Sequence, residues 1–334
     1  MVPDNCRFVI AKKKKFLDPK SQKFFVDGIV RDYDLQPEDK VSDHHQEGGS
    51  DCQIQDTQLP SNSTSLLEQL QTKPSVEIVS PVYDPDCIIA AVYLILEREY
   101  LIQPIARQRM LAVSLMCDHL IIPPARYPEL QKYNILAAKC IGSIYATREN
   151  WRQAFHLSKL EGEWNEADQV KLESASFERM VRWFAAAIRG DYPWPGEFTS
   201  LSRSHWKKVN RLKHQILCDK LITVEDGVVV FDARKLSSRD PRAAYAAMRK
   251  LRLVDNLRIL TIWQNYSGSK FTFWTNPEHD AWPEFSYHEF ISKFNYLTHS
   301  QGGARRTWGG SDWDVDILER ISVPEVIRLL KKHS

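Results

Sequence analysis

Acidic and histidine residues gather at three places in the first part of the chain, and together they could bind divalent metal ions. The first place is Asp27, which ends the apolar run Phe25-Val26. The second is the tripeptide Asp43-His44-His45, and the third is the pair Asp84 and Asp86. Carboxylates and imidazoles together suit Mn, Fe, Co or Zn, whereas oxygen-only sites suit Mg or Ca. Two such ions held close together can polarise a phosphoryl group and generate hydroxide from water near neutral pH.

Each of these places also has a purely structural interpretation. An aspartate at a strand end is usually a turn or cap residue, and Asp84 before a helix can be an N-cap that the helix dipole favours. A His-His pair in a loop is more often at the surface than on a metal. All three places nevertheless fall near strand ends of one α/β region, where such folds place their ligands. This coincidence favours one shared site over three separate structural roles.

The elements that must position these residues are predicted from hydrophobic pattern. Short apolar runs predict strands over 7–11, 23–30 and 76–80. A polar stretch over 47–64 is expected to be a loop, followed by a helix over 65–72. The apolar segment 87–101 predicts a buried helix. A strand, an acidic turn and a helix in succession form an α/β unit.

The rest of the chain changes from helical to mixed structure near residue 222. Apolar residues at helical spacing predict helices over 110–116, 135–145, 177–188 and 206–217. Beyond them the pattern predicts a hairpin, with strands over 222–224 and 228–231 joined by a turn at Asp226-Gly227. A helix over 241–251 with an aspartate N-cap follows. The remaining predicted elements are strands over 259–265 and 271–275 and helices over 287–296 and 323–332. The fold class is therefore α/β in three parts. We expect a parallel-sheet metal-binding domain over 1–125, a helical connecting or lid segment over 126–221, and a smaller α/β domain over 222–334.

Composition narrows the class of protein. The 334 residues include 45 basic and 43 acidic ones, so the chain lacks the basic excess of a protein that coats nucleic acid. The six cysteines form no CxxC pair, which argues against a zinc knuckle and suits a reducing compartment. No signal peptide is recognisable at the start, and the longest apolar stretch, 87–96, is too short to span a bilayer. We expect a cytoplasmic protein with no membrane partner, and a homodimer is an allowed oligomeric state.

The tripeptide Asp43-His44-His45 resembles the signature of the DHH phosphoesterase superfamily, which includes single-strand exonucleases, oligonucleotide and cyclic-dinucleotide hydrolases, and manganese pyrophosphatases. The strand-end Asp27 and the pair Asp84 and Asp86 resemble further metal-binding motifs of that family. The resemblance implies metal ligation by Asp27, His44, Asp84, Asp86 and Asp118. It also implies that His45 contacts the scissile phosphate and that Asp43 orients the histidines. The implied cofactor is a divalent metal, Mn first, with Mg, Co or Zn as alternatives.

Two departures from the family pattern bear on activity. The Asp-x-Asp motif comes first in the family, but here Asp84 and Asp86 follow the Asp-His-His tripeptide. Val82 also occupies the position where the family has a histidine. Three alternatives follow. The site binds only a single metal ion well, or a histidine from elsewhere in the chain, such as His119, replaces the missing ligand, or the site has lost its catalytic activity.

A glycine-rich segment near the C-terminus, 301–311, is predicted to be a loop that grips the substrate. Glycines allow backbone amides to approach an anion, and arginine binds phosphate oxygens with two parallel hydrogen bonds. The segment resembles the glycine-rich stretch of the DHH-associated C-terminal domain, although His299 lies just before it rather than inside it. The alternative is a flexible interdomain or hairpin loop. The substrate-binding residues expected here are Gly302, Gly303, Arg305, Arg306, Gly309, Gly310 and Ser311.

Two basic segments are interpreted as solvated surfaces rather than sites. Lys12–Lys15 extends a strand and discourages edge pairing, and the basic residues over 205–214 lie on one predicted helix. The leading functional prediction is a metal-dependent phosphohydrolase or phosphodiesterase that uses metal-activated water. Its expected substrates are nucleotides, short oligonucleotides or other small phosphorylated molecules. The alternative is a catalytically degenerate DHH-like protein that binds a nucleotide or partner without hydrolysis.

Overall fold

The computed structural model describes residues 5–42, 75–96, 100, 103–118, 128–154, 165–191, 196–234, 236, 240–253, 259–265, 269–275, 297–301, 308–313, 324, 327–328 and 331. The chain divides into two compact units. The first unit contains the described residues up to Cys117 and from Glu129 to His205, and the second contains Asp118, Pro128 and those from Trp206 onward.

The first unit is built on a four-stranded sheet in which every pair of neighbouring strands is parallel. Its strands, in the spatial order β1-β4-β2-β3, are β1 (Cys6–Ile10), β4 (Val76–Ser80), β2 (Gln22–Val26) and β3 (Lys40–Ser42). All five residues of β4 are buried, as expected for an inner strand covered on both faces. The three predicted strands are therefore confirmed, and the parallel α/β class with them. The strand predicted over 23–30 ends early, at Val26, and β3 was not predicted.

Among the described residues, the long helices that lie in the first unit, wholly or but for a last residue, are α2 (Pro85–Ile95), α4 (Pro104–Asp118), α5 (Asn134–Ala154) and α6 (Glu166–Arg189). The described part of the chain also has short 3-10 turns at η1 (Lys14–Phe16) and η4 (Pro128–Tyr133). Each long helix overlaps a predicted one, and α4, α5 and α6 extend the predicted ranges at both ends.

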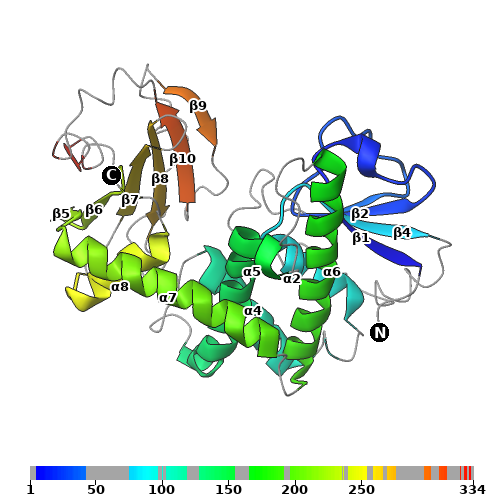
Figure 1. The fold of residues 1–334 in the computed structure, drawn as a ribbon, viewed down its shortest axis with the longest axis horizontal. Helices are drawn as coiled ribbons and strands as arrows, with labels where there is room; N and C mark the ends of the chain where they lie inside the picture. The colour runs from blue at the N-terminus through cyan, green and yellow to red at the C-terminus, as the bar shows by residue number, and fades with distance from the viewer. Residues whose placement is uncertain are drawn as a thin grey trace. The chain divides into compact units, whose positions relative to one another are not determined.

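Helix α6 covers the edge strand β1 (Figure 1). The Ile10 amide donates a hydrogen bond of 2.9 Å to Ser174 Oγ, and the Phe8 and Phe177 rings meet edge to face with centroids 5.6 Å apart. A helix that covers an edge strand and binds one of its backbone donors makes that strand less available for pairing with other chains. Residues of the predicted middle segment are thus a packing layer of the first unit. The lid role remains a prediction.

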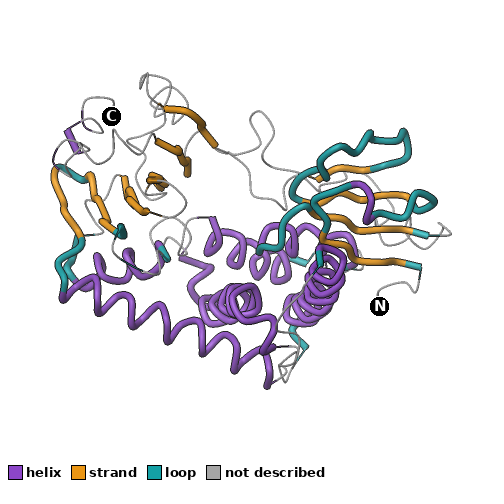
Figure 2. Tube along the Cα trace, turned by 45° about the horizontal axis from the view of Figure 1, so that its top comes forward, coloured by secondary structure: helices purple, strands orange, loops and turns teal. Residues whose placement is uncertain are grey.

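The second unit contains a mixed sheet of six strands, which Figure 2 shows in orange. Its spatial order is β5 (Ile222–Glu225), β6 (Val228–Asp232), β7 (Ile259–Asn265), β8 (Ser269–Thr275), β10 (Trp308–Trp313) and β9 (Leu297–Gln301). The parallel pair β6 and β7 is joined through α8 (Pro241–Lys250), whose N-cap is Asp240 as predicted. The predicted hairpin is confirmed: Asp226 and Gly227 both have positive φ, 48° and 82°, as a type I′ turn requires.

The core of the second unit lies between its first strands and two helices. Val209, Leu212 and Ile216 project from α7 (Gly196–Cys218) at helical spacing and pack with Phe231 of β6 and Met248 of α8. Among the described helices of both units, none is long and apolar enough to cross a membrane.

Candidate metal centre

The parallel sheet of the first unit brings the ends of its strands to one edge. Because β1, β4, β2 and β3 run in the same direction, Ile10, Ser80, Val26 and Ser42 all end at this carboxyl edge. The Asp27 amide donates a 2.7 Å hydrogen bond to the Ser42 carbonyl, which continues the β2–β3 ladder by one step. The carboxyl edge of an open parallel sheet is where such folds bind ligands.

Asp27 is held in an uncommon conformation at this edge. Its φ is 57°, in the left-handed region, and its side chain is buried at 3% exposure. A non-glycine residue in this region costs about 1–3 kcal/mol, and such residues cluster at functional sites. The left-handed turn is also the reason that β2 ends at Val26 and not near residue 30.

Gly28 allows the turn after β2 to approach the turn after β4. Its φ is 115°, and a Cβ atom placed there would lie 3.0 Å from Pro81 Cγ. Any side chain at this position would therefore push the Asp27 turn away from the segment that leads to Asp84. The sequence Asp27-Gly28 thus combines a buried carboxylate with the close backbone contact that positions it.

Asp84 is the N-cap of α2, so its predicted structural role is confirmed, and its metal-binding role remains a prediction. Its Oδ1 accepts a hydrogen bond of 3.1 Å from the Cys87 amide, and the Cys87 thiol donates one of 3.2 Å to the Asp84 carbonyl. Pro85 occupies the first position of the helix, where its missing N–H costs nothing. Asp86 lies in the same first turn, and its side chain is buried at 9% exposure.

The carboxylates from the two strand ends both influence the buried thiol of Cys87. Burial raises the pKa of this thiol well above its usual value of 9.0, and the negative charge of Asp84, followed by that of Asp27, raises it further. Both carboxylates therefore lie within electrostatic reach of one buried sulfur, although the chain separates them by more than fifty residues. Cys87 was not among the predicted site residues, and its only signal in the sequence is its place three residues after Asp84.

Several predicted site residues lie outside the described residues. These are Asp43, His44 and His45, which follow β3 directly in the chain, and Gly302, Gly303, Arg305 and Arg306. Asp118 is the last residue of α4, and its side chain is outside the description as well. Their predicted roles remain predictions.

The glycine-rich segment is only partly a loop. Gln301 ends β9, and Gly309, Gly310 and Ser311 lie within β10, which pairs with both β8 and β9. The prediction of one continuous loop over 301–311 is therefore wrong at both ends. Glycine weakens an isolated strand, but here the backbone of β10 is fixed by a partner on each side. The hairpin interpretation fits better, because β9 and β10 are antiparallel neighbours.

The described carboxylates do not by themselves complete a metal site. Within the described ranges, no group of three or more histidine, cysteine, aspartate or glutamate side chains is arranged to hold a metal ion. Asp27, Asp84 and Asp86 are hard oxygen donors of the kind that divalent cations prefer. The donor set thus fits a metal only in combination with further ligands, for which the histidines after β3 have the right chemistry.

Comparison with known proteins gives a fold likeness and little more. No protein-family model matches the chain, and no curated protein matches it. Among solved structures, the pGpG-specific phosphodiesterase PggH from Vibrio cholerae matches at 10% identity over 94% of this chain and 100% of its own, with a TM-score of 0.44. The exonuclease RecJ bound to manganese matches at 15% identity over 77% of this chain and 65% of its own, with a TM-score of 0.31.

Both TM-scores are below 0.5. Superpositions this loose transfer no residue's role to this chain. The functional proposal depends on the residues at the carboxyl edge.

Proposed function

We propose that this chain is a metal-dependent phosphohydrolase or phosphodiesterase that acts on nucleotides, short oligonucleotides or other small phosphorylated molecules. The observation that supports it most is the placement of Asp27 and Asp84 on the turns after the neighbouring strands β2 and β4, which approach each other where Gly28 abuts Pro81 at the carboxyl edge of the parallel sheet. Two buried or half-buried carboxylates on neighbouring turns concentrate negative charge, which a divalent cation would neutralise.

In this proposal the ligands come from the turns after three strands and from α4. Asp27, Asp84 and Asp86 supply oxygens, and His44 supplies an imidazole nitrogen, with Asp118 as a further carboxylate. A bound divalent metal, most simply Mn, with Mg, Co or Zn as alternatives, supplies an activated water and neutralises phosphate charge. His45 contacts the scissile phosphate, and Asp43 orients both histidines by hydrogen bonding.

The second candidate function is a binding protein that holds a nucleotide or partner without hydrolysing it. Val82 favours this alternative, because it puts an aliphatic side chain, 39% exposed, where the family motif has a histidine ligand. The chain then has one fewer nitrogen donor to offer a metal.

Metal content and phosphodiester hydrolysis, measured together, separate the two functions. We expect the wild-type chain to retain up to two equivalents of Mn²⁺ and to hydrolyse a generic phosphodiester. Asp27→Asn removes a charged ligand, so we expect it to lose most of the metal and to be slower by about a hundredfold or more. Asp34→Asn is a matched control, because the Asp34 side chain is 90% exposed and contacts Lys14.

A wild-type chain that retains metal and hydrolyses the ester, with Asp34→Asn unchanged, supports the enzyme. No metal and no turnover, combined with a rise in melting temperature on adding a nucleotide, supports the binding protein. Equal activity of Asp27→Asn and wild type contradicts the proposed role of Asp27.

A further inference from the structure

Lys12 differs from the three lysines that follow it. Lys13 and Lys15 both pair with Glu166, each at 2.8 Å, and Lys14 lies 3.5 Å from an exposed aspartate. Lys12 forms no ion pair with any residue that the structure describes. It follows β1 by two residues and lines a cavity of about 100 Å³ at the carboxyl edge of the sheet.

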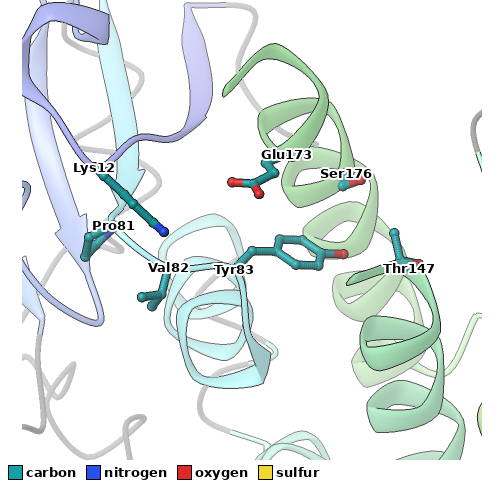
Figure 3. A pocket seen from close by; sticks show the side chains of 7 residues that line it. All are labelled: Lys12, Pro81, Val82, Tyr83, Thr147, Glu173 and Ser176. Carbon is teal, nitrogen blue, oxygen red and sulfur yellow. The ribbon is translucent and has the colours of Figure 1, made fainter. Parts of the chain in front are cut away.

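The cavity is formed by the sheet on one side and by two helices on the other (Figure 3). Lys12 extends into it from the end of β1, and the turn after β4 contributes Val82 and Tyr83. Glu173 and Ser176 of α6, with Thr147 of α5, complete the opposite wall. Asp27, Asp84 and Asp86 do not line it. They lie on adjoining parts of the same edge, since Gly28 abuts Pro81, the residue that precedes Val82.

The polar groups of this wall have unused hydrogen-bonding capacity. Ser176 is only 2% exposed, and its Oγ has no hydrogen-bond partner in the described part of the chain. The Thr147 hydroxyl donates 2.7 Å to the Ser143 carbonyl, so it can only accept from a ligand. Glu173 accepts one hydrogen bond, of 2.9 Å from Gln169, and keeps further acceptor positions. Buried polar groups are almost always matched, so an unmatched buried hydroxyl points to a ligand or water.

The charges of the lining select a kind of ligand. One ammonium and one carboxylate cancel, which disfavours a second phosphate and favours a neutral group that both donates and accepts hydrogen bonds. Adjacent sugar hydroxyls are such a group, and in dinucleotide-binding α/β folds an acidic side chain near the carboxyl edge of the sheet accepts from a ribose 2′-hydroxyl. A cavity of roughly 150 Å³ admits a benzene ring, so this one, which opens to solvent, has room for a five-membered ring but not for a whole nucleotide.

We propose that this cavity binds the ribose of the nucleotide substrate, with Glu173 accepting from the 2′-hydroxyl and with Lys12 and Ser176 donating to sugar oxygens. The inference rests on the proposed function, because it places the sugar beside the phosphate that the metal centre would bind. The hydrogen bond from the 2′-hydroxyl to Glu173 makes the chain selective for ribonucleotides over 2′-deoxyribonucleotides.

The test is calorimetric titration of the full chain, with Mn²⁺ present, using adenosine 5′-monophosphate and its 2′-deoxy counterpart. We expect the wild type to bind the ribonucleotide about tenfold more tightly, the effect of losing one hydrogen bond to a charged group. Glu173→Gln should bring the two affinities close together while the deoxynucleotide binds as before. Lys12→Met should weaken binding of both nucleotides. Lys14→Met is the matched control and should behave as wild type.

Hydrolysis of a generic phosphodiester, measured on the same preparations, distinguishes the failure of this inference from that of the function. The cavity is not a ribose site if the wild type binds both nucleotides equally, or if the preference for the ribonucleotide survives in Glu173→Gln. This holds whether or not the chain hydrolyses the phosphodiester. If neither nucleotide binds, the inference fails, and if hydrolysis is also absent, the proposed function fails with it. If Glu173→Gln does not fold, Lys12→Met provides the test, because Lys12 is exposed and its substitution should not disturb folding. A Lys12→Met variant that binds both nucleotides as tightly as the wild type does overturns the inference.

Discussion

At the scale of single residues, Asp27 is both structurally unfavourable and well positioned. Its carboxylate is buried, its φ of 57° is uncommon for a residue with a side chain, and the neighbouring Gly28 has no room for one. Aspartate tolerates the left-handed conformation better than most residues. A protein that only needed a turn here could use glycine or asparagine. A buried carboxylate at this turn suits a residue whose charge has a function.

Gly28→Ala tests how tightly the two turns depend on each other. The substitution combines a positive φ with a Cβ atom 3.0 Å from Pro81 Cγ, so we expect a loss of roughly 1–3 kcal/mol in the free energy of unfolding. Metal binding should weaken as well, because the Asp27 turn moves. Urea unfolding and Mn²⁺ titration measure the two effects. Gly196→Ala is a suitable control, since nothing lies within 4 Å of a Cβ atom there.

A second buried charge, Glu77, lies across the sheet from Arg7 and Lys23. Register places these three residues side by side on β1, β4 and β2. Both Glu77 and Lys23 are 1% exposed, and Lys23 Nζ lies 3.4 Å from Glu77 Oε2. Glu77 also accepts from the Asp18 amide at 3.0 Å. Burial raises the pKa of Glu77, and Arg7 opposes that shift.

Removing this charge should change how the stability of the first unit depends on pH. The raised pKa has a defined sign: the folded state binds more protons than the unfolded state between pH 4.5 and the raised value. The contribution of Glu77 protonation to stability is therefore full below pH 4.5 and is lost as the pH rises through that window. Glu77→Gln imitates the protonated side chain, so we expect its free energy of unfolding to lack this decline. Urea unfolding of both proteins across this range measures the difference, and a Glu77→Gln variant whose stability falls with pH as steeply as that of the wild type would contradict the prediction.

At the scale of elements, the helix α2 connects a structural role with a proposed chemical one. Asp84 caps the helix through its Oδ1 and contributes, in our proposal, a metal-binding carboxylate. The two roles can be separated because serine caps helices about as well as aspartate does but offers no charge.

Asp84→Ser should therefore leave stability within about 0.5 kcal/mol of wild type, while Mn²⁺ affinity and hydrolysis fall. Asp84→Ala should lose the cap as well, at a cost of about 1 kcal/mol. Thermal unfolding and metal titration of both variants give the answer. A serine variant that retains full metal affinity would mean that Asp84 is only a cap.

The sequence predicts elements well where one strong local pattern defines them. Apolar runs predict β1 and β4, and Asp226-Gly227 predicts the hairpin of β5 and β6. It fails for β3, because Lys40–Ser42 contains a single apolar residue and is a strand only through its pairing with β2. It also makes β2 too long, since an apolar pattern does not reveal that Asp27 turns left-handed.

The candidate site shows the same limit. The convergence of Asp27 and Asp84 follows from a simple rule, that parallel strands end at one edge, so the sequence suffices to predict it. The ribose cavity depends on Lys12 and Glu173, which lie 161 positions apart and meet only because α6 packs on β1. No local pattern marks either residue, and the run Lys12–Lys15 looks like a solvated edge until three of its members are seen to be paired.

At the scale of the whole molecule, the residues with proposed functions are distributed over the two units. The first unit carries the carboxyl edge, the proposed metal ligands and the ribose cavity, and its helices α5 and α6 are part of that structure. The second unit carries the strand β10 with Gly309 and Gly310, whose proposed role in holding substrate awaits a test. The nearly balanced charge of the chain suits small or short substrates better than long duplexes.

We propose that Asp27, His44 and the Asp84–Asp86 turn surround one metal centre, and anomalous diffraction from a crystal soaked in Mn²⁺ can locate that centre. We expect a manganese peak within about 2.0–2.6 Å of an Asp27 carboxylate oxygen and in contact with a ring nitrogen of His44. Manganese that binds only elsewhere on the chain, or an Asp27 and a His44 found on separate faces of the first unit, would contradict it.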